Sequence, residues 1–174
     1  GLDISSSSVK MLEIVEAGRG AYRVERYSIE ALPKDAVVDG NVNNLEAVAD
    51  AVKRGHKRLG TRTKHVAMSV PSGAVITKKI ILPAGLREDE MEVQVEAEAN
   101  QYIPFSLDEV SLDFCVIGPS PASMDDVEVL IAASRKDRVQ DRQSLAEAAG
   151  LEPVVLDIES HASRLAIGRW TACL

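Results

Sequence analysis

The residues best suited to chemistry lie near the start of the chain, in the stretch LDISSSSVKMLEI at positions 2–14. Four serines, Ser5–Ser8, stand between an acid, Asp3, and a base, Lys10. Successive backbone N–H groups and hydroxyls on a turn can form a concave anion site, to which a lysine adds charge. Asp3 could hold Mg²⁺ through water. The pattern predicts a phosphate-binding turn made of Asp3, Ser5, Ser6, Ser7, Ser8 and Lys10.

A plain structural turn explains the same residues. Serine hydroxyls bond to nearby backbone groups and stabilise turns by themselves. On pattern alone, a solvent-exposed serine hairpin is therefore the commoner outcome of such a run, and both interpretations stay open.

A second unusual segment is QYIPFSL, residues 101–107. It places three large apolar side chains after an expected helix end, where Pro104 prevents the helix from continuing. These side chains either plug a core or help to wall a groove for a short extended peptide. The groove interpretation assigns Ser72, Gly73, Tyr102, Ile103, Pro104 and Phe105.

Other polar residues carry weaker signals. The three histidines lack the spacing of metal ligands. The basic segment 53–64 could touch anionic lipid or nucleic acid, but cations at a helix C-terminus are the commoner explanation. Cys115 and Cys173 are far apart and predict no disulfide framework, which fits a reducing compartment. Cys115 alternates into a predicted strand and is expected in a core.

The elements that must position these residues follow from periodicity and breakers. The segment MEVQVEAEA fits both a strand and a helix, and its length, helix formers and acidic first turn favour helix. Asn43 or Asn44 is the expected N-cap of the first helix. Strands are predicted at 2–5, 8–16, 22–32, 65–70, 75–82, 110–117, 127–134 and 153–158, and helices at 45–59, 88–101, 136–149 and 159–169.

This order predicts an α/β fold of two subdomains. Residues 1–70 plus 151–174 form a first subdomain, and a strand–helix–strand–strand–helix module at 71–150 is inserted into it. The 174 residues are 45% hydrophobic, enough for a packed core, and no apolar run reaches the ~20 residues that span a bilayer. The net charge of −7 argues against nucleic acid as a partner. The chain opens in a strand without Met and closes in a helix, so both ends are expected to be cut from a longer sequence.

The segments GLDISSSSVKMLEI, AVITKKI, EAEANQYIPFSLDEVSLDF, LIAASRKDRV and GLEPVVLDIESHA occur in the order seen in the PilM family. PilM proteins are cytoplasmic actin-like proteins of type IV pilus assembly, related to FtsA within the actin, sugar kinase and Hsp70 superfamily. DISSSSVK also resembles the first phosphate motif of that superfamily, with Ser5 where many members carry Gly. The resemblance covers essentially the whole chain and implies the first lobe only. It implies an actin-like, ribonuclease H-like subdomain with a small inserted α+β subdomain.

The resemblance also implies a nucleotide site. DIESHASRLA resembles the first connecting motif of the superfamily, which makes Glu159, and secondly Asp157, acids that face Mg²⁺ indirectly together with Asp3. Acids that complement a helix dipole explain them equally well. The family implies ATP and Mg²⁺ as cofactors, slow or absent turnover, and no catalytic residue. Because the second phosphate and adenosine motifs lie in the other lobe, we expect residues 1–174 alone to bind ATP poorly.

The implied function is that of an assembly adaptor. In the family the partner is the cytoplasmic N-terminal tail of PilN, held in a groove between the first and inserted subdomains. Other pilus platform proteins and self-association are further implied contacts, and localisation is cytoplasmic, at the bacterial inner membrane through partners. The alternatives are an FtsA-like division filament protein and an actin-superfamily phosphotransferase, which would need a catalytic base that the sequence does not display.

Overall fold

The computed structural model describes residues 1–18 and 20–171, so Cys173 lies outside the described residues. The chain divides into two compact units. The first unit contains Gly1–Ser72 and the chain from Gln140 onward, and the inserted unit is Gly73–Val139.

A five-stranded mixed sheet forms the centre of the first unit, with the strand order β10-β6-β1-β2-β3. β1 pairs antiparallel with β2, and β2 pairs antiparallel with β3, whereas β6 runs parallel to both β1 and β10. A short hairpin turn can join two antiparallel strands, whereas two parallel strands require a long crossover connection. The strands are β1 (Leu2–Ile4), β2 (Ser8–Gly18), β3 (Ala21–Ala31), β6 (His65–Val70) and β10 (Glu152–Ile158).

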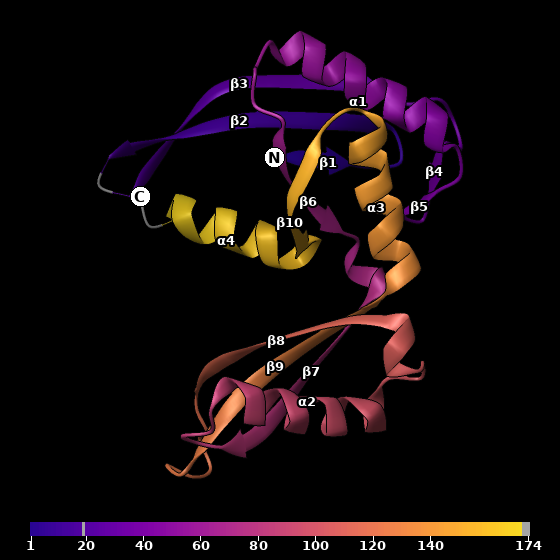
Figure 1. The fold of residues 1–174 in the computed structure, drawn as a ribbon. Helices are drawn as coiled ribbons and strands as arrows, with labels where there is room; N and C mark the ends of the chain where they lie inside the picture. Colours follow the sequence, from indigo (N-terminus) through magenta and orange to yellow (C-terminus); the bar gives the residue numbers. More distant parts are fainter. Residues whose placement is uncertain (19, 172–174) are drawn as a thin grey trace. The chain divides into compact units, whose positions relative to one another are not determined.

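Helices cover both faces of this sheet. α1 (Leu45–Leu59) and α4 (Glu159–Thr171) lie on opposite sides of β2 and β3 (Figure 1). The Asn44 side chain accepts a hydrogen bond from Ala47 N at 3.0 Å, so Asn44, one of the two expected N-caps, caps the helix. Gly60 ends α1 in the left-handed conformation. α1 packs on a core that is rich in small aliphatic residues and methionine, among them Val9, Met11, Val48, Val52, Met68 and Leu145.

β3 alternates apolar and polar residues, and the apolar ones do not face α1. Its polar face lies against α1, where Ser28 is 2% exposed and donates to Gly55 O at 2.9 Å. Glu30 pairs with Arg54 and Arg58 of α1 at 3.4 and 3.0 Å. The missing side chain of Gly55 leaves room for this polar contact, and two of the basic residues in 53–64 are used in it. The apolar side chains of β3 point away and are exposed: Tyr22, Val24, Tyr27 and Ile29.

The inserted unit is a three-stranded antiparallel sheet of order β7-β9-β8, with α2 across one face (Figure 1). The ambiguous segment is a helix, because Met91, Val95 and Ala99 recur at helical spacing and are all buried against the sheet. Cys115 is exposed, so its prediction as a core residue was wrong. The elements are β7 (Val75–Pro83), α2 (Glu88–Tyr102), β8 (Val110–Pro119) and β9 (Asp126–Arg135).

The inserted unit is shorter than the predicted module at 71–150. α3 (Lys136–Ala148) follows β9 directly, and most of it belongs to the first unit. Leu145 and Ala146 are fully buried in the core of the first unit, which explains the earlier boundary. The prediction had no means of telling which core the apolar positions of this helix would join.

A short hairpin was not predicted. β4 (Val37–Val38) and β5 (Asn41–Val42) pair across Asp39 and Gly40, both with positive φ, at 49° and 77°. An Asp-Gly pair between two short apolar runs is the sequence signal for this turn.

Candidate functional site

The serine run forms the tight turn between β1 and β2. Ser5 N and Ser5 Oγ both donate to Ser8 O at 3.0 Å, and the two hydroxyls lie 3.2 Å apart. Leu32 N donates to Ser7 O at 2.9 Å, which ties the turn to the end of β3. Ser6 and Ser7 are exposed at its tip. The turn is thus internally bonded and presents two hydroxyls to solvent.

Asp3 and Lys10 are direct cross-strand partners beside this turn. Lys10 Nζ donates to Asp3 Oδ2 at 2.8 Å, and each side chain is 48% exposed. An ion pair this exposed contributes little to stability. Lys10 could therefore exchange Asp3 for another anion at small cost.

The structure brings the predicted acids and Lys10 to one hollow of about 770 Å³ on the α4 side of the sheet. Its lining includes Asp3 from β1, Lys10 from β2, Asp157 from β10 and Glu159 from α4. Ser5–Ser8 are not part of that lining. The rest of the wall is mainly apolar and includes Leu12, Tyr27, Ile29, Val155, Ala162 and Ala166.

Two acids flank the start of α4, Asp157 near the end of β10 and Glu159 at the first position of the helix. Asp157 Oδ1 accepts a hydrogen bond from Ile158 N at 2.7 Å, and Ser160 N donates to Ser72 Oγ at 3.1 Å. Glu159 stands in the first turn, where a carboxylate complements the helix dipole. No three acidic, histidine or cysteine side chains among the described residues converge closely enough to ligate a metal ion. The predicted contact of Asp3, Asp157 and Glu159 with Mg²⁺ runs through water and stays a prediction.

Arg142 of α3 is the residue near this hollow that sequence reasoning missed. It is 3% exposed, and its Nη2 donates to Gly40 O at 2.8 Å. Burial lowers the pKa of Arg142, and the nearby carboxylates of Asp3, Glu159 and Asp141 oppose that shift. It is one of three arginines in residues 135–142, and no pattern distinguished it from the other two.

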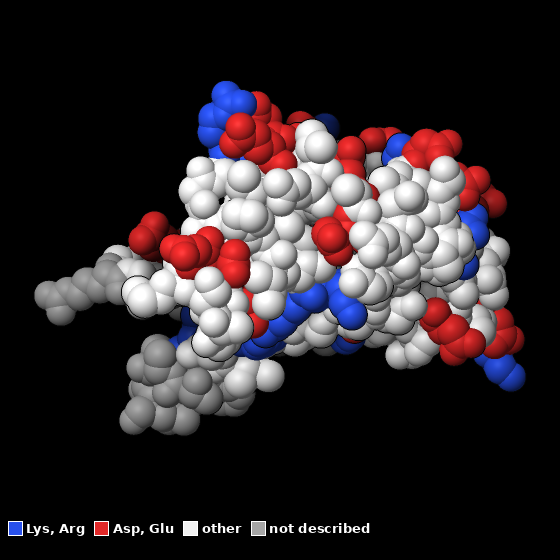
Figure 2. All heavy atoms as spheres, turned by 90° about the horizontal axis from the view of Figure 1, so that it is seen from below, with Lys and Arg blue, Asp and Glu red and all other residues white. Residues whose placement is uncertain are grey.

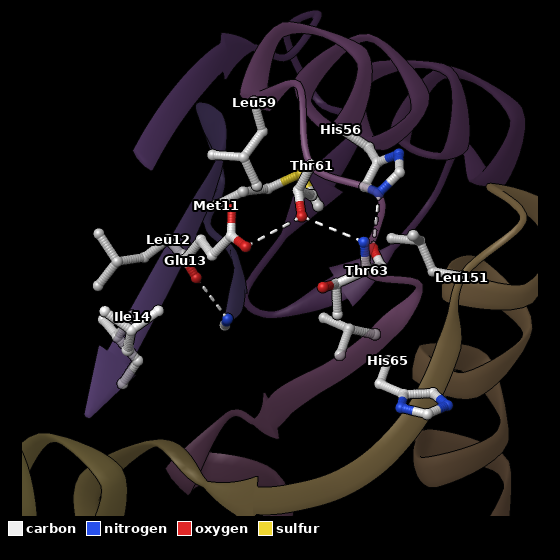
Figure 3. Close-up of a pocket in the computed structure, with 13 residues that line it drawn as sticks. Met11, Leu12, Glu13, Ile14, His56, Leu59, Thr61, Thr63, His65 and Leu151 are labelled. Carbon is white, nitrogen blue, oxygen red and sulfur yellow. Dashed lines mark hydrogen bonds between the residues drawn. The ribbon is translucent and has the colours of Figure 1, made fainter. Parts of the chain in front are cut away.

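A second, smaller pocket of about 320 Å³ lies between β2 and the loop after α1 (Figure 3). Thr61 Oγ1 donates to Glu13 Oε1 at 3.1 Å and accepts from Thr63 N at 3.1 Å, while His56 Nε2 donates to Thr63 O at 2.9 Å. Glu13 Oε2 forms an ion pair with Arg26 Nε at 3.7 Å. These bonds hold the loop on the sheet, whereas the buried Glu13 Oε2 accepts no hydrogen bond from the described residues.

The residues predicted for a peptide groove fall on both units, Ser72 on the first and Gly73 with residues 102–105 on the inserted one. Ile103 is 8% exposed and packs in the core of the inserted unit, so its side chain is not available to a peptide. Tyr102 and Phe105 are exposed. Each ring lies near a cation, with Lys78 Nζ 4.5 Å from the Tyr102 ring centre and Arg135 Cζ 5.5 Å from that of Phe105.

Charge on the face shown in Figure 2 is mixed, with separate acidic and basic clusters and a short basic streak near its middle. That face carries no continuous positive surface of the kind that nucleic-acid binding proteins show. Among the described residues, none of the helices combines the length and apolar character needed to cross a bilayer.

The sheet, its helices on both faces and the inserted unit define an actin-like α/β lobe. Residues 1–174 match the family described as type IV pilus assembly protein PilM, and the chain belongs to that family. It is 31% identical to a chain of a solved PilM-PilN type IV pilus biogenesis complex, with a TM-score of 0.80 over 92% of this chain and 47% of that one. The fold is also similar to the cytoplasmic domain of EpsL, an inner membrane component of the type II secretion system of Vibrio cholerae. That match has a TM-score of 0.52 at 11% identity, covering 90% of this chain and 55% of that domain. The chain thus spans about half the length of the solved relatives it matches.

Proposed function

We propose that this lobe belongs to a type IV pilus assembly adaptor that binds ATP with Mg²⁺ and holds the N-terminal tail of a PilN-like membrane protein. The observation that carries the proposal is the meeting of Asp3, Lys10, Asp157 and Glu159 at one hollow beside the serine turn. These residues come from four separate elements of the fold. Membership of the PilM family and the likeness to a chain of a PilM-PilN complex support the partner.

The donor set fits a nucleotide phosphate with its metal ion. Ser6 and Ser7 offer exposed hydroxyls at the turn, and the exposed Lys10 ammonium can swing from Asp3 to a phosphate oxygen. Mg²⁺ keeps several of its waters when it binds to proteins, and Asp3, Asp157 and Glu159 would hold those waters. When bound, the nucleotide would supply negative charge that sets the arrangement of the lobes in the full-length protein.

Slow or absent ATP turnover fits the same residues. A phosphotransferase needs a base within hydrogen-bond reach of the acceptor. The carboxylates at the hollow are instead assigned to the metal ion and to Lys10. Steady ATP turnover that one small-molecule acceptor accelerates would argue for a phosphotransferase and against an adaptor.

The partner site includes the exposed rings of the inserted unit. Tyr102 and Phe105 present apolar surface beside Lys78 and Arg135, so a segment with apolar anchors and an acidic or main-chain oxygen fits this surface. Binding of a membrane protein's tail would place this protein at the cytoplasmic side of the inner membrane through its partner.

The test of nucleotide binding is the double variant Lys10→Ala with Ser6→Ala in the full-length protein. We expect ATP affinity to fall at least tenfold, since each ~1.4 kcal/mol is tenfold. The melting temperature without ATP should hardly change, because exposed turn substitutions stay within about 0.5 kcal/mol. Lys64→Ala with Ser144→Ala removes the same groups from other exposed positions and serves as the control. A double variant that loses stability but keeps its ATP affinity would make the serine run a structural turn.

A further inference from the structure

The turn at Asp39–Gly40 contacts both places where the chain passes between the units. The chain leaves the first unit after Ser72 and returns to it at Gln140. Gly40 packs so tightly on Pro71 that a Cβ built on it would lie 2.6 Å from Pro71 Cγ. On its other side, Gly40 O accepts the 2.8 Å hydrogen bond from Arg142. The Asp39–Gly40 turn therefore contacts Pro71, just before the chain leaves the first unit, and Arg142, just after the chain returns to it.

Arg142 connects this turn to the hollow electrostatically. A buried cation persists in a fold only when polar or charged groups compensate for the water it has lost. Gly40 O supplies one such group, and the carboxylates of Asp3 and Glu159 supply opposite charge nearby. Both carboxylates line the hollow. A change in the charge near Asp3 or Glu159 therefore changes the electrostatic interaction of these carboxylates with Arg142.

Ser72 connects the exit point to the same hollow. Its hydroxyl accepts the 3.1 Å hydrogen bond from Ser160 N in the first turn of α4, one residue after Glu159. The position of α4, which carries one acid of the hollow, is thus tied to the last residue of the first unit before the insertion.

We propose that Gly40, Pro71, Ser72 and Arg142 form a junction that makes affinity for the partner peptide depend on the phosphate groups bound at the hollow. This rests on the proposed function. A phosphate would draw the Lys10 ammonium away from Asp3, which leaves the Asp3 carboxylate to interact more strongly with Arg142. The states with and without bound phosphate then differ in the hydrogen bond from Arg142 to Gly40 O. They differ as a consequence where the chain leaves the first unit, at Pro71, and where it returns, at Arg142. By linkage the peptide must alter nucleotide affinity by the same factor.

The experiment measures the dissociation constant of a fluorescently labelled PilN-like tail peptide for the full-length protein, with and without ATP and Mg²⁺. We expect the two constants of the wild type to differ at least fivefold, the lower range of measured couplings. Arg142→Met should reduce that ratio below about twofold, a level too small to count as such coupling. Arg142→Lys, which keeps the charge, should recover part of it. Arg62→Met removes an exposed arginine at the opposite end of β6 and should keep the wild-type ratio.

Two results would overturn the junction while leaving the proposed function intact. One is a wild type that binds both ligands with a ratio below twofold, and the other is a folded Arg142→Met protein with the wild-type ratio. If circular dichroism shows that Arg142→Met does not fold, Pro71→Ala decides the same question, because it removes the Cγ on which Gly40 packs and changes no charge of the hollow. A full wild-type ratio in Pro71→Ala would likewise overturn the junction. A wild type that binds neither ATP nor peptide would contradict the proposed function itself, and the junction with it.

Discussion

In the inserted unit the apolar residues of the sheet point at α2, whereas in the first unit the apolar residues of β3 point away from α1. Val129 and Ile131 of β9 are buried beneath α2. Tyr27 and Ile29 of β3 are 72% and 53% exposed, while the polar Ser28 between them is buried on α1. The same alternation of residue types thus leads to opposite orientations. The inserted unit closes its core by itself, and the first unit leaves a wide apolar surface outside its core.

The largest expected effect tests whether α3 packs in the core of the first unit or in that of the inserted unit. Leu145→Ala should lower the free energy of unfolding of the first unit by about 2–5 kcal/mol, because Leu145 is fully buried and leaves a cavity. Denaturant unfolding gives the size. Hydrogen exchange followed by mass spectrometry should show faster exchange in β6 and β10, and little change in β7–β9. Leu165→Ala, at a 55% exposed position of α4, is the control. Loss of protection confined to the inserted unit would restore α3 to that unit.

The next effect tests the close contact of α1 with the polar face of β3. Gly55→Val should destabilise the protein by about 1–3 kcal/mol, the usual cost of overpacking. A Cβ on Gly55 already lies 3.1 Å from Met11 Sδ and 3.5 Å from Ser28 Oγ, so a branched side chain has no room. Lys57→Val on the exposed side of the same helix corrects for the lower helix propensity of valine. Equal melting temperatures for the two variants would mean that α1 and β3 are not packed this closely.

A smaller effect concerns the exposed rings of the inserted unit. Phe105→Ala should lower affinity for a PilN-like tail peptide by at least ~1 kcal/mol, the threshold of an energetically significant interface residue. Fluorescence anisotropy measures the affinity, and circular dichroism checks the fold. Val93→Ala, at a 67% exposed position of α2, is the matched control for an exposed apolar residue. Unchanged affinity in a folded Phe105→Ala protein would exclude this ring from the partner site.

The smallest effect tests the exposed apolar surface of the first unit. In the chain of residues 1–174, Tyr27→Ser should change the free energy of unfolding by no more than about 0.5 kcal/mol, since exposed positions contribute little. Urea unfolding followed by far-UV circular dichroism is sufficient. Destabilisation above 1 kcal/mol would show that residues 1–174 themselves cover β3, which would remove the contrast between the two units.

The sequence predicted most elements because their signals were local. Val95 and Ala99 lie at helical spacing, and Asn44 has the side chain of an N-cap, so both helices could be predicted within a residue or two. The direction in which β3 faces was not local, since it depends on a glycine in α1 that admits Ser28. Arg142 was also beyond prediction, because its role depends on Gly40 and Asp3, which only the folded chain brings near.

The candidate site divides in the same way. Asp3 and Lys10 are close because a hairpin pairs them directly, which their spacing already implied. Asp157 and Glu159 reach the same hollow only because β10 returns to the sheet next to β6, after the whole inserted unit. Their placement was expected from family resemblance, and spacing alone offered no reason for it. Ile103 was the opposite case, since its apolar type suited a groove and a core equally.

The first unit is discontinuous along the chain, and this affects the order in which the protein can fold during synthesis. β6 pairs in parallel with β10, so Val66 cannot pair with Pro153 until the ribosome has synthesised the inserted unit. Domains generally fold as units as they emerge, and contacts between residues far apart in sequence form slowly. The inserted unit, whose strands and helix are neighbours in sequence, can therefore complete its core first. Until β10 arrives, one edge of β6 is an unpaired strand that another nascent chain could join, which makes this interval the step most exposed to aggregation.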